Sequence, residues 1–303
     1  MSRELKTLDD VLAAAMAQAP YKVAVAAGHD EAALQALALA EEKGLATAYL
    51  VGEEPLITEA LARMPKPLAK AEIIPAAGEE DAAKKAVALV RTGKAHMVLK
   101  GKLQTKAIMR AVLDREAGLR KGRLLSDAFV CEYAAPEGTR LLCITDGGIN
   151  VAPDLEGKKQ LILNAVELYH ALGFPRPRVA VLNAVETPIP DHKPSEDAVA
   201  LQKMWEEGQL PDCAVEGPLS LDLSVSVAAA AKKGHQTEVA GRADILLCPE
   251  IVSANLLAKG TTYFAGYRLA HVTMGATAPV LIPSRADTAE AKFYSIALSA
   301  LTC

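Results

Sequence analysis

The sequence predicts an α/β fold in which mainly parallel sheets are flanked by helices. Short apolar runs that end near glycine alternate with amphipathic segments along most of the 303 residues. The composition agrees, with 51% hydrophobic, 23% charged and only 4% aromatic residues. Strands that alternate with helices form right-handed βαβ units on a parallel sheet. Because domains commonly hold about 100 to 200 residues, this length allows one large or two medium domains.

The first third of the chain shows the alternation most clearly. After an interrupted amphipathic segment at residues 11–19, the apolar residues 21–27 predict a strand that ends at Gly28. Asp30 then begins a helix that we expect to reach residue 43. Further strands are expected at residues 47–51, 71–74 and 96–99, and further helices at residues 54–64, 79–91 and 105–114.

A different pattern interrupts the alternation in the middle of the chain. Residues 123–131 and 140–144 favour strands and flank the turn residues 136–138, which predicts a β-hairpin. We place a domain boundary there, so that residues 1–140 with 285–303 form one domain and residues 141–284 the other. In the second half, strands are expected at residues 179–182, 212–216 and 244–247, helices at residues 157–172, 194–207 and 224–233, and a helix-rich region at residues 253–269.

Several classes of function are disfavoured by composition. The net charge is −4 and basic residues do not cluster with aromatics, so nucleic-acid binding is not expected. No stretch of about 18 apolar residues is present to span a membrane, and residues 1–19 show no leader pattern, which predicts a cytoplasmic protein. The five cysteines lack CxxC pairing, and four lie in or beside apolar runs, which is typical of buried thiols.

Ser284 and Arg285 are the first candidates for a functional site. They follow an apolar run at residues 278–283 and precede a helical pattern that extends to about residue 301. A strand-to-helix turn offers unpaired backbone N–H groups and the positive end of a helix dipole, which favour an anion. The alternative is that Ser284 only caps the helix and that Arg285 is a solvated residue of its first turn.

Polar residues after other strands give further candidates for ligand binding. Asp146 and Asn150 follow an apolar strand, and Glu216 and Asp222 bracket a Gly-Pro turn after another. Ligands of α/β sheets bind outside the carboxyl ends of strands. An Asx-rich turn would explain the first pair equally well. No metal site is expected, because no histidine or third carboxylate cluster accompanies these acids.

The segment after residue 99 adds cations to this set. Lys100 and Lys102 flank a glycine, and Thr105 follows at the start of a predicted helix, which it could cap while the first N–H groups face an anion. Two surface lysines are the alternative. Neither GxGxxG nor GxxxxGK[ST] is present, so a dinucleotide loop or a P-loop is disfavoured.

Four segments together resemble the phosphotransacylase family, which comprises phosphate acetyltransferases and phosphate butyryltransferases. Their order and spacing over about 300 residues match most closely the shorter, butyryl-type members. The segments are residues 99–105 (LKGKLQT) with Arg110, residues 144–153 (ITDGGINVAP), residues 215–222 (VEGPLSLD) and residues 283–287 (PSRAD).

The resemblance implies a fold, a reaction and partners. It implies two α/β domains of the isocitrate/isopropylmalate dehydrogenase-like kind with the active-site cleft between them, and a homodimer or higher homo-oligomer. The implied reaction converts acyl-CoA and inorganic phosphate reversibly to acyl phosphate and coenzyme A, with a short acyl group such as butyryl. Coenzyme A is then a substrate, and no cofactor is implied to stay bound. Many anionic oxygens must be held, which calls for cations and N–H donors.

The resemblance also suggests roles for individual residues. Arg285 would hold the phosphate or the oxyanion, Ser284 would donate a hydrogen bond to the same charge, and Arg110 would bind substrate. Acetyl-type members have an aspartate seven residues after the serine, where this chain has Ala291. Asp287 or Glu290 could take its place, although both could simply complement the helix dipole.

Three rival functions remain open at this stage. The first is a phosphate acetyltransferase. The second is a catalytically silent protein of the same fold that binds acyl-CoA or acyl phosphate. The third is a nicotinamide-dependent decarboxylating dehydrogenase, which should carry a metal-binding aspartate cluster that the sequence does not show.

Overall fold

The computed structural model describes residues 4–303, which form two compact α/β units. One unit holds Leu8–Arg123 and Ala270–Cys303, and the other holds residues 4–7 and Leu124–Leu269. We call them the pocket unit and the hairpin unit, after a pocket and a β-hairpin that are described below. The boundaries of these units differ from those of the expected domains, which were residues 1–140 with 285–303 and residues 141–284. Which segments fold independently stays a prediction.

The pocket unit has a mainly parallel sheet in the order β3-β2-β1-β4-β11-β10. Strands β1, β2, β3, β4 and β11 run parallel, whereas β10 runs antiparallel to β11. The direction of winding reverses between β1 and β4, which makes a topological switch point. The strands are β1 (Tyr21–Ala26), β2 (Ala46–Gly52), β3 (Glu72–Pro75), β4 (Met97–Lys100), β10 (Leu269–Met274) and β11 (Val280–Leu281).

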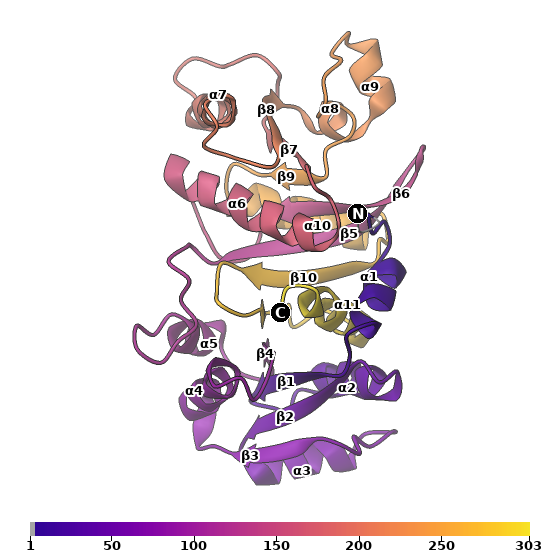
Figure 1. The fold of residues 1–303 in the computed structure, drawn as a ribbon, viewed down its shortest axis with the longest axis vertical. Helices are drawn as coiled ribbons and strands as arrows, with labels where there is room; N and C mark the ends of the chain where they lie inside the picture. Colours follow the sequence, from indigo (N-terminus) through magenta and orange to yellow (C-terminus); the bar gives the residue numbers. More distant parts are fainter. Residues whose placement is uncertain (1–3) are drawn as a thin grey trace. The chain divides into compact units, whose positions relative to one another are not determined.

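Helices cover both faces of this sheet (Figure 1). Helices α4 and α5 pack together on one face, and α11 packs against α1 and α2 on the other. The strands are buried on both faces, which explains their nearly continuous apolar sequence. The helices are α1 (Leu8–Met16), α2 (Glu31–Glu42), α3 (Glu54–Ala62), α4 (Gly78–Arg91), α5 (Thr105–Val112) and α11 (Ala289–Ala300).

The hairpin unit has a sheet in the order β5-β6-β9-β7-β8. Strands β5 and β6 form the expected antiparallel hairpin, and β6, β9, β7 and β8 are parallel. Its elements are β5 (Ser126–Ala135), β6 (Gly138–Thr145), β7 (Arg178–Leu182), β8 (Ala214–Leu219), β9 (Ile245–Leu247), α6 (Leu155–Ala171), α7 (Lys193–Glu206), α8 (Leu221–Val225), α9 (Val227–Lys232) and α10 (Ile251–Tyr263).

Most expected elements are present, with three differences. The helix expected at residues 224–233 is broken at Ser226, whose side chain accepts from the Ala229 N–H and so begins α9. The expected Gly-Pro turn is absent because Gly217 and Pro218 continue β8. The region expected to be helical to residue 269 ends as a helix at Tyr263, and β10 follows it.

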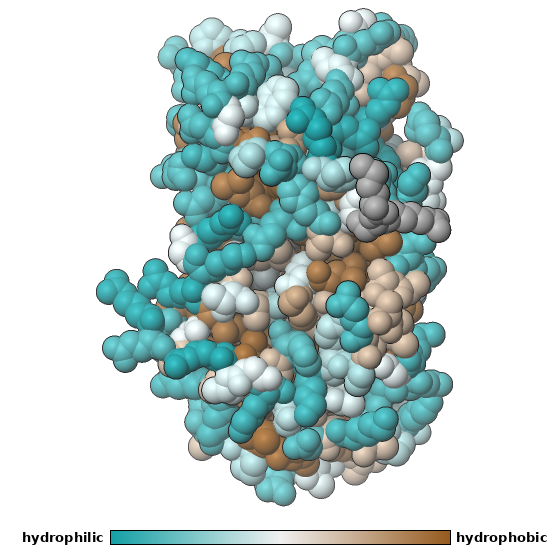
Figure 2. Space-filling model, in the orientation of Figure 1, coloured by the Kyte–Doolittle hydropathy of each residue, from teal (hydrophilic) through white to brown (hydrophobic). Residues whose placement is uncertain are grey.

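Most buried side chains are hydrophobic, and few polar or charged side chains are buried. On the face drawn in Figure 2 hydrophilic residues dominate and apolar residues form small groups. The four cysteines expected inside are buried, and burial raises the pKa of their thiols, to about 12 for Cys131 and Cys248. No helix within residues 4–303 is long and apolar enough to cross a membrane.

A buried ion pair joins two helices of the hairpin unit. Lys158 Nζ on α6 lies 2.7 Å from Asp197 Oδ2 on α7, and the two side chains are 5% and 3% exposed. Lys193 Nζ lies 2.7 Å from the other oxygen of Asp197. Loss of one partner would leave the other charge buried without compensation.

We therefore expect Asp197→Ala to lower the free energy of unfolding by about 3–5 kcal/mol. Glu196→Ala, at an exposed position of the same helix, should change it by less than about 0.5 kcal/mol. Urea denaturation of both variants measures this. The double variant Lys158→Met/Asp197→Leu should recover most of the stability, and an Asp197→Ala loss below about 1 kcal/mol would contradict the interpretation.

Candidate active site

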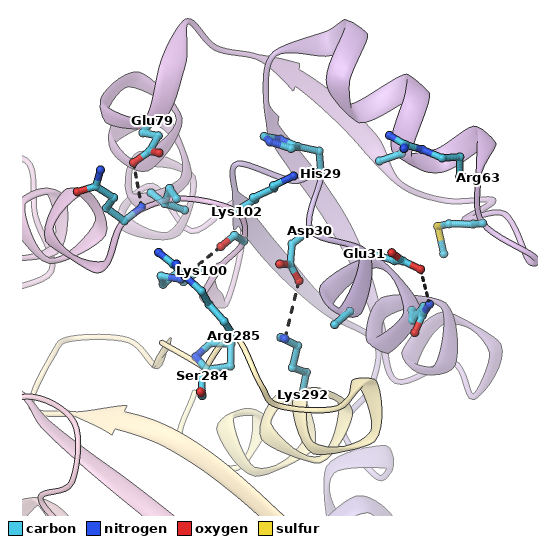
Figure 3. Close-up of a pocket in the computed structure, with 18 of the residues that line it drawn as sticks. His29, Asp30, Glu31, Arg63, Glu79, Lys100, Lys102, Ser284, Arg285 and Lys292 are labelled. Carbon is cyan, nitrogen blue, oxygen red and sulfur yellow. Dashed lines mark hydrogen bonds and ion pairs between the residues drawn. The ribbon is translucent and has the colours of Figure 1, made fainter. Parts of the chain in front are cut away.

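A pocket of about 990 Å³ lies at the carboxyl ends of three adjacent parallel strands, β1, β4 and β11. All of its lining residues belong to the pocket unit (Figure 3). The volume lies at the upper end of the usual range for small-molecule sites, about 300–1,000 Å³. Its central lining comes from His29 and Asp30 after β1, Lys100 and Lys102 at the end of β4, and Ser284 and Arg285 after β11.

The backbone at the end of β4 is locked to the end of β1. Gly101 N–H donates to Ala26 O at 2.8 Å, and Lys102 N–H donates to Ala27 O at 3.0 Å. A Cβ atom at residue 101 would lie 2.3 Å from Ala27 O, closer than any side chain tolerates. Glycine at residue 101 therefore permits the close approach that brings Lys100 and Lys102 to the pocket.

Two lysines in the pocket lining are almost fully buried. Lys100 is 7% exposed, and its Nζ lies 3.5 Å from Gly101 O, at the outer limit of a hydrogen bond. Lys292, on α11, is 3% exposed. Burial lowers the pKa of Lys100; nearby Asp30 opposes this effect, and Arg285 and Lys292 add to it. Buried ammonium groups beside an open pocket favour the binding of an anion.

The turn after β11 is held by a carboxylate rather than by the start of the helix. Asp287 Oδ2 accepts the Ser284 N–H at 2.7 Å and lies 2.9 Å from His271 Nε2 on β10. Helix α11 begins only at residue 289, where Thr288 accepts the Ala291 N–H as N-cap. The alternative interpretation, in which Ser284 only caps this helix, was therefore wrong.

Ser284 and Arg285 both line the pocket. Ser284 Oγ accepts the Ala286 N–H at 3.3 Å, and a hydroxyl that accepts one hydrogen bond can still donate another. Arg285 is exposed to solvent and extends along the pocket near Lys100 (Figure 3). A hydroxyl donor and a guanidinium thus stand next to a buried ammonium group, which is a suitable arrangement for oxygens that carry negative charge.

Two of the three acidic residues in the pocket lining accept backbone N–H groups, whereas Glu31 Oε1 accepts the Gln35 side-chain amide at 3.3 Å. Asp30 Oδ1 accepts the Ala33 N–H at 2.8 Å as the N-cap of α2. Glu79 Oε2 accepts the Gln104 N–H at 2.9 Å. These carboxylates therefore shape the pocket walls while the cations face its interior.

His29 adds an imidazole to the same wall. Burial lowers its pKa and nearby Lys102 adds to this effect, while three carboxylates (Glu53, Asp30 and Glu79) act in the opposite direction. With its pKa below the ordinary value of about 6.5, His29 is neutral at pH 7. Lysine and arginine side chains therefore carry the positive charge of this pocket.

Arg110 and Thr105 lie on α5, outside the set that lines the pocket. Arg110 is 60% exposed, and its Nη1 lies 2.7 Å from Glu80 Oε1. Thr105 is the first residue of α5, and Gln104 occupies the N-cap position, so the expected capping by Thr105 was wrong. Their roles in substrate binding stay predictions.

Asp146 and Asn150 are in direct contact within the hairpin unit. Asp146 Oδ1 accepts the N–H groups of Gly148 and Ile149, and Oδ2 accepts the Asn150 side-chain amide at 2.6 Å. This is the Asx-turn geometry that was the alternative to a ligand site. Burial raises the pKa of Asp146, and Asp127 nearby raises it further. Substrate contact by this pair stays a prediction.

Glu216 lies within β8 of the hairpin unit rather than after it. Its Oε1 is 2.6 Å from His235 Nε2, and its Oε2 accepts a hydrogen bond from the Thr237 hydroxyl. Asp222 lies in α8 and pairs with Lys233 at 3.1 Å. A ligand role for Glu216 stays a prediction. Within residues 4–303 no group of three or more histidine, cysteine or acidic side chains could hold a metal ion.

Sequence reasoning missed several residues of this site, among them His29, Asp30, His271 and Lys292. Lys292 resembles any solvated lysine of an amphipathic helix, and His271 sits in a strand that was not expected. The sequence does contain a signal for Lys292, because it is the one charged residue in the mainly apolar segment 291–300 (AKFYSIALSA), all of which is buried in α11.

The comparison with known proteins identifies the family. The sequence model described as phosphate acetyl/butaryl transferase matches residues 71–300. The chain belongs to this family. A phosphate butyryltransferase of Clostridium acetobutylicum is 39% identical over 297 residues, which is 98% of this chain and 98% of the relative. A phosphate acetyltransferase of Rhizobium meliloti is 39% identical over 97% of this chain and 92% of the relative.

Solved structures agree with this assignment. A branched-chain phosphotransacylase from Enterococcus faecalis V583 is 28% identical with a TM-score of 0.81, covering 92% of this chain and 98% of its own. A 4-hydroxythreonine-4-phosphate dehydrogenase from Klebsiella pneumoniae is similar in fold alone, with 14% identity and a TM-score of 0.52 over 92% of this chain and 97% of its own. The chain is a phosphate acyltransferase, an enzyme that transfers an acyl group reversibly between coenzyme A and phosphate.

The contacts of Asp287 predict how the turn responds to acid. Burial acts to raise the pKa of Asp287, but the hydrogen bond and charge of His271, the Ser284 N–H and Lys292 outweigh it, so the pKa is lowered. A lowered pKa stabilises the fold above the unfolded value of about 3.9, and this contribution is lost as the pH falls through the folded pKa.

We therefore expect Asp287→Asn to lower the free energy of unfolding at pH 7, and the difference from wild type to shrink as the pH falls below about 4. Urea denaturation at several pH values measures this difference. Glu290→Gln removes an exposed carboxylate three residues later and should show little difference at any pH. A gap between wild type and Asp287→Asn that stays constant down to about pH 2 would contradict the pairing.

Proposed function

We propose that the pocket of the pocket unit binds the phosphate group of the reaction and that Ser284 and Arg285 stabilise the transition state of acyl transfer. One observation carries this proposal. Ser284, Arg285 and Lys100 come from two segments about 180 residues apart, and all three line one pocket at the ends of adjacent strands. Open α/β sheets bind ligands at such strand ends, close to a switch point.

The chemistry assigns each group a task. In one direction a phosphate oxygen attacks the thioester carbonyl of acyl-CoA, the C–S bond breaks, and coenzyme A leaves as a thiolate that takes up a proton. In the intermediate the carbonyl oxygen carries negative charge. Arg285 and the Ser284 hydroxyl donate to the phosphate or to this oxygen, and the Lys100 ammonium neutralises the phosphate.

Asp287 supports this chemistry through the backbone. Its Oδ2 is engaged by the Ser284 N–H and His271, so we assign it to holding the turn rather than to proton transfer. A strong base for the thiol is unnecessary, because a thiol with a pKa of about 8.5 is already a few per cent thiolate at pH 7. Ala291 occupies the position at which acetyl-type members have an aspartate, and alanine has no titratable side chain.

The acyl group is proposed to be short and butyryl-like. The relatives at about 40% identity include butyryltransferases and an acetyltransferase, and the first solved structure is a branched-chain enzyme. Coenzyme A is proposed as a substrate rather than a resident cofactor, and the chain as a cytoplasmic homodimer or higher homo-oligomer. The isocitrate/isopropylmalate dehydrogenase-like arrangement of two domains is part of the same proposal.

Release of coenzyme A from butyryl-, isobutyryl- and acetyl-CoA with inorganic phosphate tests this proposal. We expect turnover with all three and the highest kcat/KM with a four-carbon acyl group. Since each methylene contributes about 1–3 kcal/mol, the preference over acetyl should be about tenfold or more. Binding of acyl-CoA without turnover would instead establish the silent binding protein, and a preference for acetyl would establish the acetyltransferase.

Removal of the proposed oxyanion donors should lower turnover while coenzyme A affinity changes little. We expect Ser284→Ala to lower kcat about 10²-fold and Arg285→Ala about 10³-fold or more, because backbone N–H groups can partly replace a hydroxyl but not a cation. Arg285→Lys should recover little, since the bidentate fork is lost.

Steady-state kinetics and thermal melting of the three variants provide the measurement. Arg242→Ala is a suitable control, because Arg242 is an exposed arginine in the hairpin unit. Turnover of Arg285→Ala within about threefold of wild type would remove this turn from the catalytic site.

A further inference from the structure

Lys292 has an unusual position for a charged side chain. It lies on α11 among ten consecutive buried residues, and only 3% of it is exposed. Nevertheless it lines the pocket, and Figure 3 shows its amino group directed toward Asp30. Lysine is almost never this buried unless it is well paired.

The protein partners of Lys292 are weak for a buried ammonium group. Its Nζ donates to Asp287 O at 3.2 Å and lies 3.8 Å from Asp30 Oδ1, a distance at the edge of an ion pair. Asp30 already accepts the Ala33 N–H with the same oxygen. By contrast, the buried side chains of Lys158 and Asp197 are in contact at 2.7 Å.

Positive charge therefore accumulates on one wall of the pocket. Burial is the main cause that lowers the pKa of Lys100, and the charges of Arg285 and Lys292 lower it further. Asp30 and Glu79 act to raise it. The pocket lining holds five cationic side chains (Arg63, Lys100, Lys102, Arg285 and Lys292) and three acidic ones (Asp30, Glu31 and Glu79), so positive charge is in excess there. Such an arrangement is unfavourable in the empty protein and becomes favourable when an anion enters.

We propose that Lys292 is a substrate-binding residue that holds the phosphate dianion together with Lys100 and Arg285. The inference rests on the proposed function of this pocket and adds the residue that sequence reasoning missed. A phosphate group near pH 7 carries between one and two negative charges and several acceptor oxygens, which suits three cations held by β4, by the turn after β11 and by α11. The phosphates of coenzyme A offer similar chemistry, so the test separates the two sources.

The first test is calorimetric titration of wild type, Lys292→Met and Lys292→Arg with inorganic phosphate and, separately, with coenzyme A. We expect Lys292→Met to weaken phosphate binding about tenfold or more and coenzyme A binding less than about twofold, and Lys292→Arg to retain part of the phosphate affinity. Lys106→Met removes one positive charge from an exposed position of α5 outside the pocket lining, and it should leave both affinities unchanged.

Kinetics and thermal melting separate substrate binding from a structural role. Lys292→Met should raise the KM for phosphate about tenfold, leave the KM for acyl-CoA nearly unchanged, and melt without ligand at a temperature equal to or above that of wild type. A residue that only supports packing would lower the melting temperature and leave the KM for phosphate unchanged, and that result would overturn the inference. So would a larger loss of coenzyme A affinity than of phosphate affinity.

The failure of this inference can be told from the failure of the proposed function. If wild type turns over acyl-CoA with phosphate and Lys292→Met has the wild-type KM for phosphate, only the role of Lys292 is wrong. If Arg285→Ala keeps wild-type turnover and neither Arg285→Ala nor Lys292→Met alters phosphate binding, the phosphate does not bind in this pocket and both are wrong.

Discussion

The close approach of two strand ends at Gly101 is the constraint on which the candidate site depends. Two backbone hydrogen bonds join residues 101 and 102 to the carbonyl groups of Ala26 and Ala27. They bring the last residue of β4 next to the segment that begins α2, and only a residue without Cβ permits it. The lysines around Gly101, the N-cap Asp30 and the turn after β11 then surround one volume.

Acidic and cationic side chains have different roles in this geometry. Asp30, Glu79 and Asp287 each accept a backbone N–H, so the carboxylates fix the ends of α2 and α5 and the turn at Ser284. The hydrogen bonds that these carboxylates accept stabilise the backbone conformation at these three places. The cations Lys100, Arg285 and Lys292 come from the ends of strands and from a buried helix face, and they supply the charge that faces the pocket. An enzyme whose substrates are anionic requires such a distribution, because preorganised charge needs no rearrangement as the reaction proceeds.

Sequence reasoning succeeded where local patterns determine structure. The apolar runs ended by glycine are strands, the Asp30 signal is the N-cap of α2, and the hairpin around residues 136–138 is formed. It failed where two local signals compete. Ser284 has the chemistry of a cap, but Thr288 lies closer to the periodic residues and takes that position. Ser226 begins a helix inside what resembled a continuous one, and the two-residue strand β11 is too short to be delimited by periodicity.

The sequence by itself determined the α/β class, the family and the segments that carry charged and polar residues, because periodicity, turn chemistry and the order of motifs are local properties of the chain. Only the tertiary structure decided which of these residues share a site. It placed Ser284, Arg285 and Lys100 on one pocket, gave Arg110 a surface partner, and buried Lys292 beside Asp30. The physical reason is that burial and the distance between charges depend on how strands distant in sequence pair in the sheet. The effect of a lysine on an anion depends on that burial and distance rather than on its sequence neighbours.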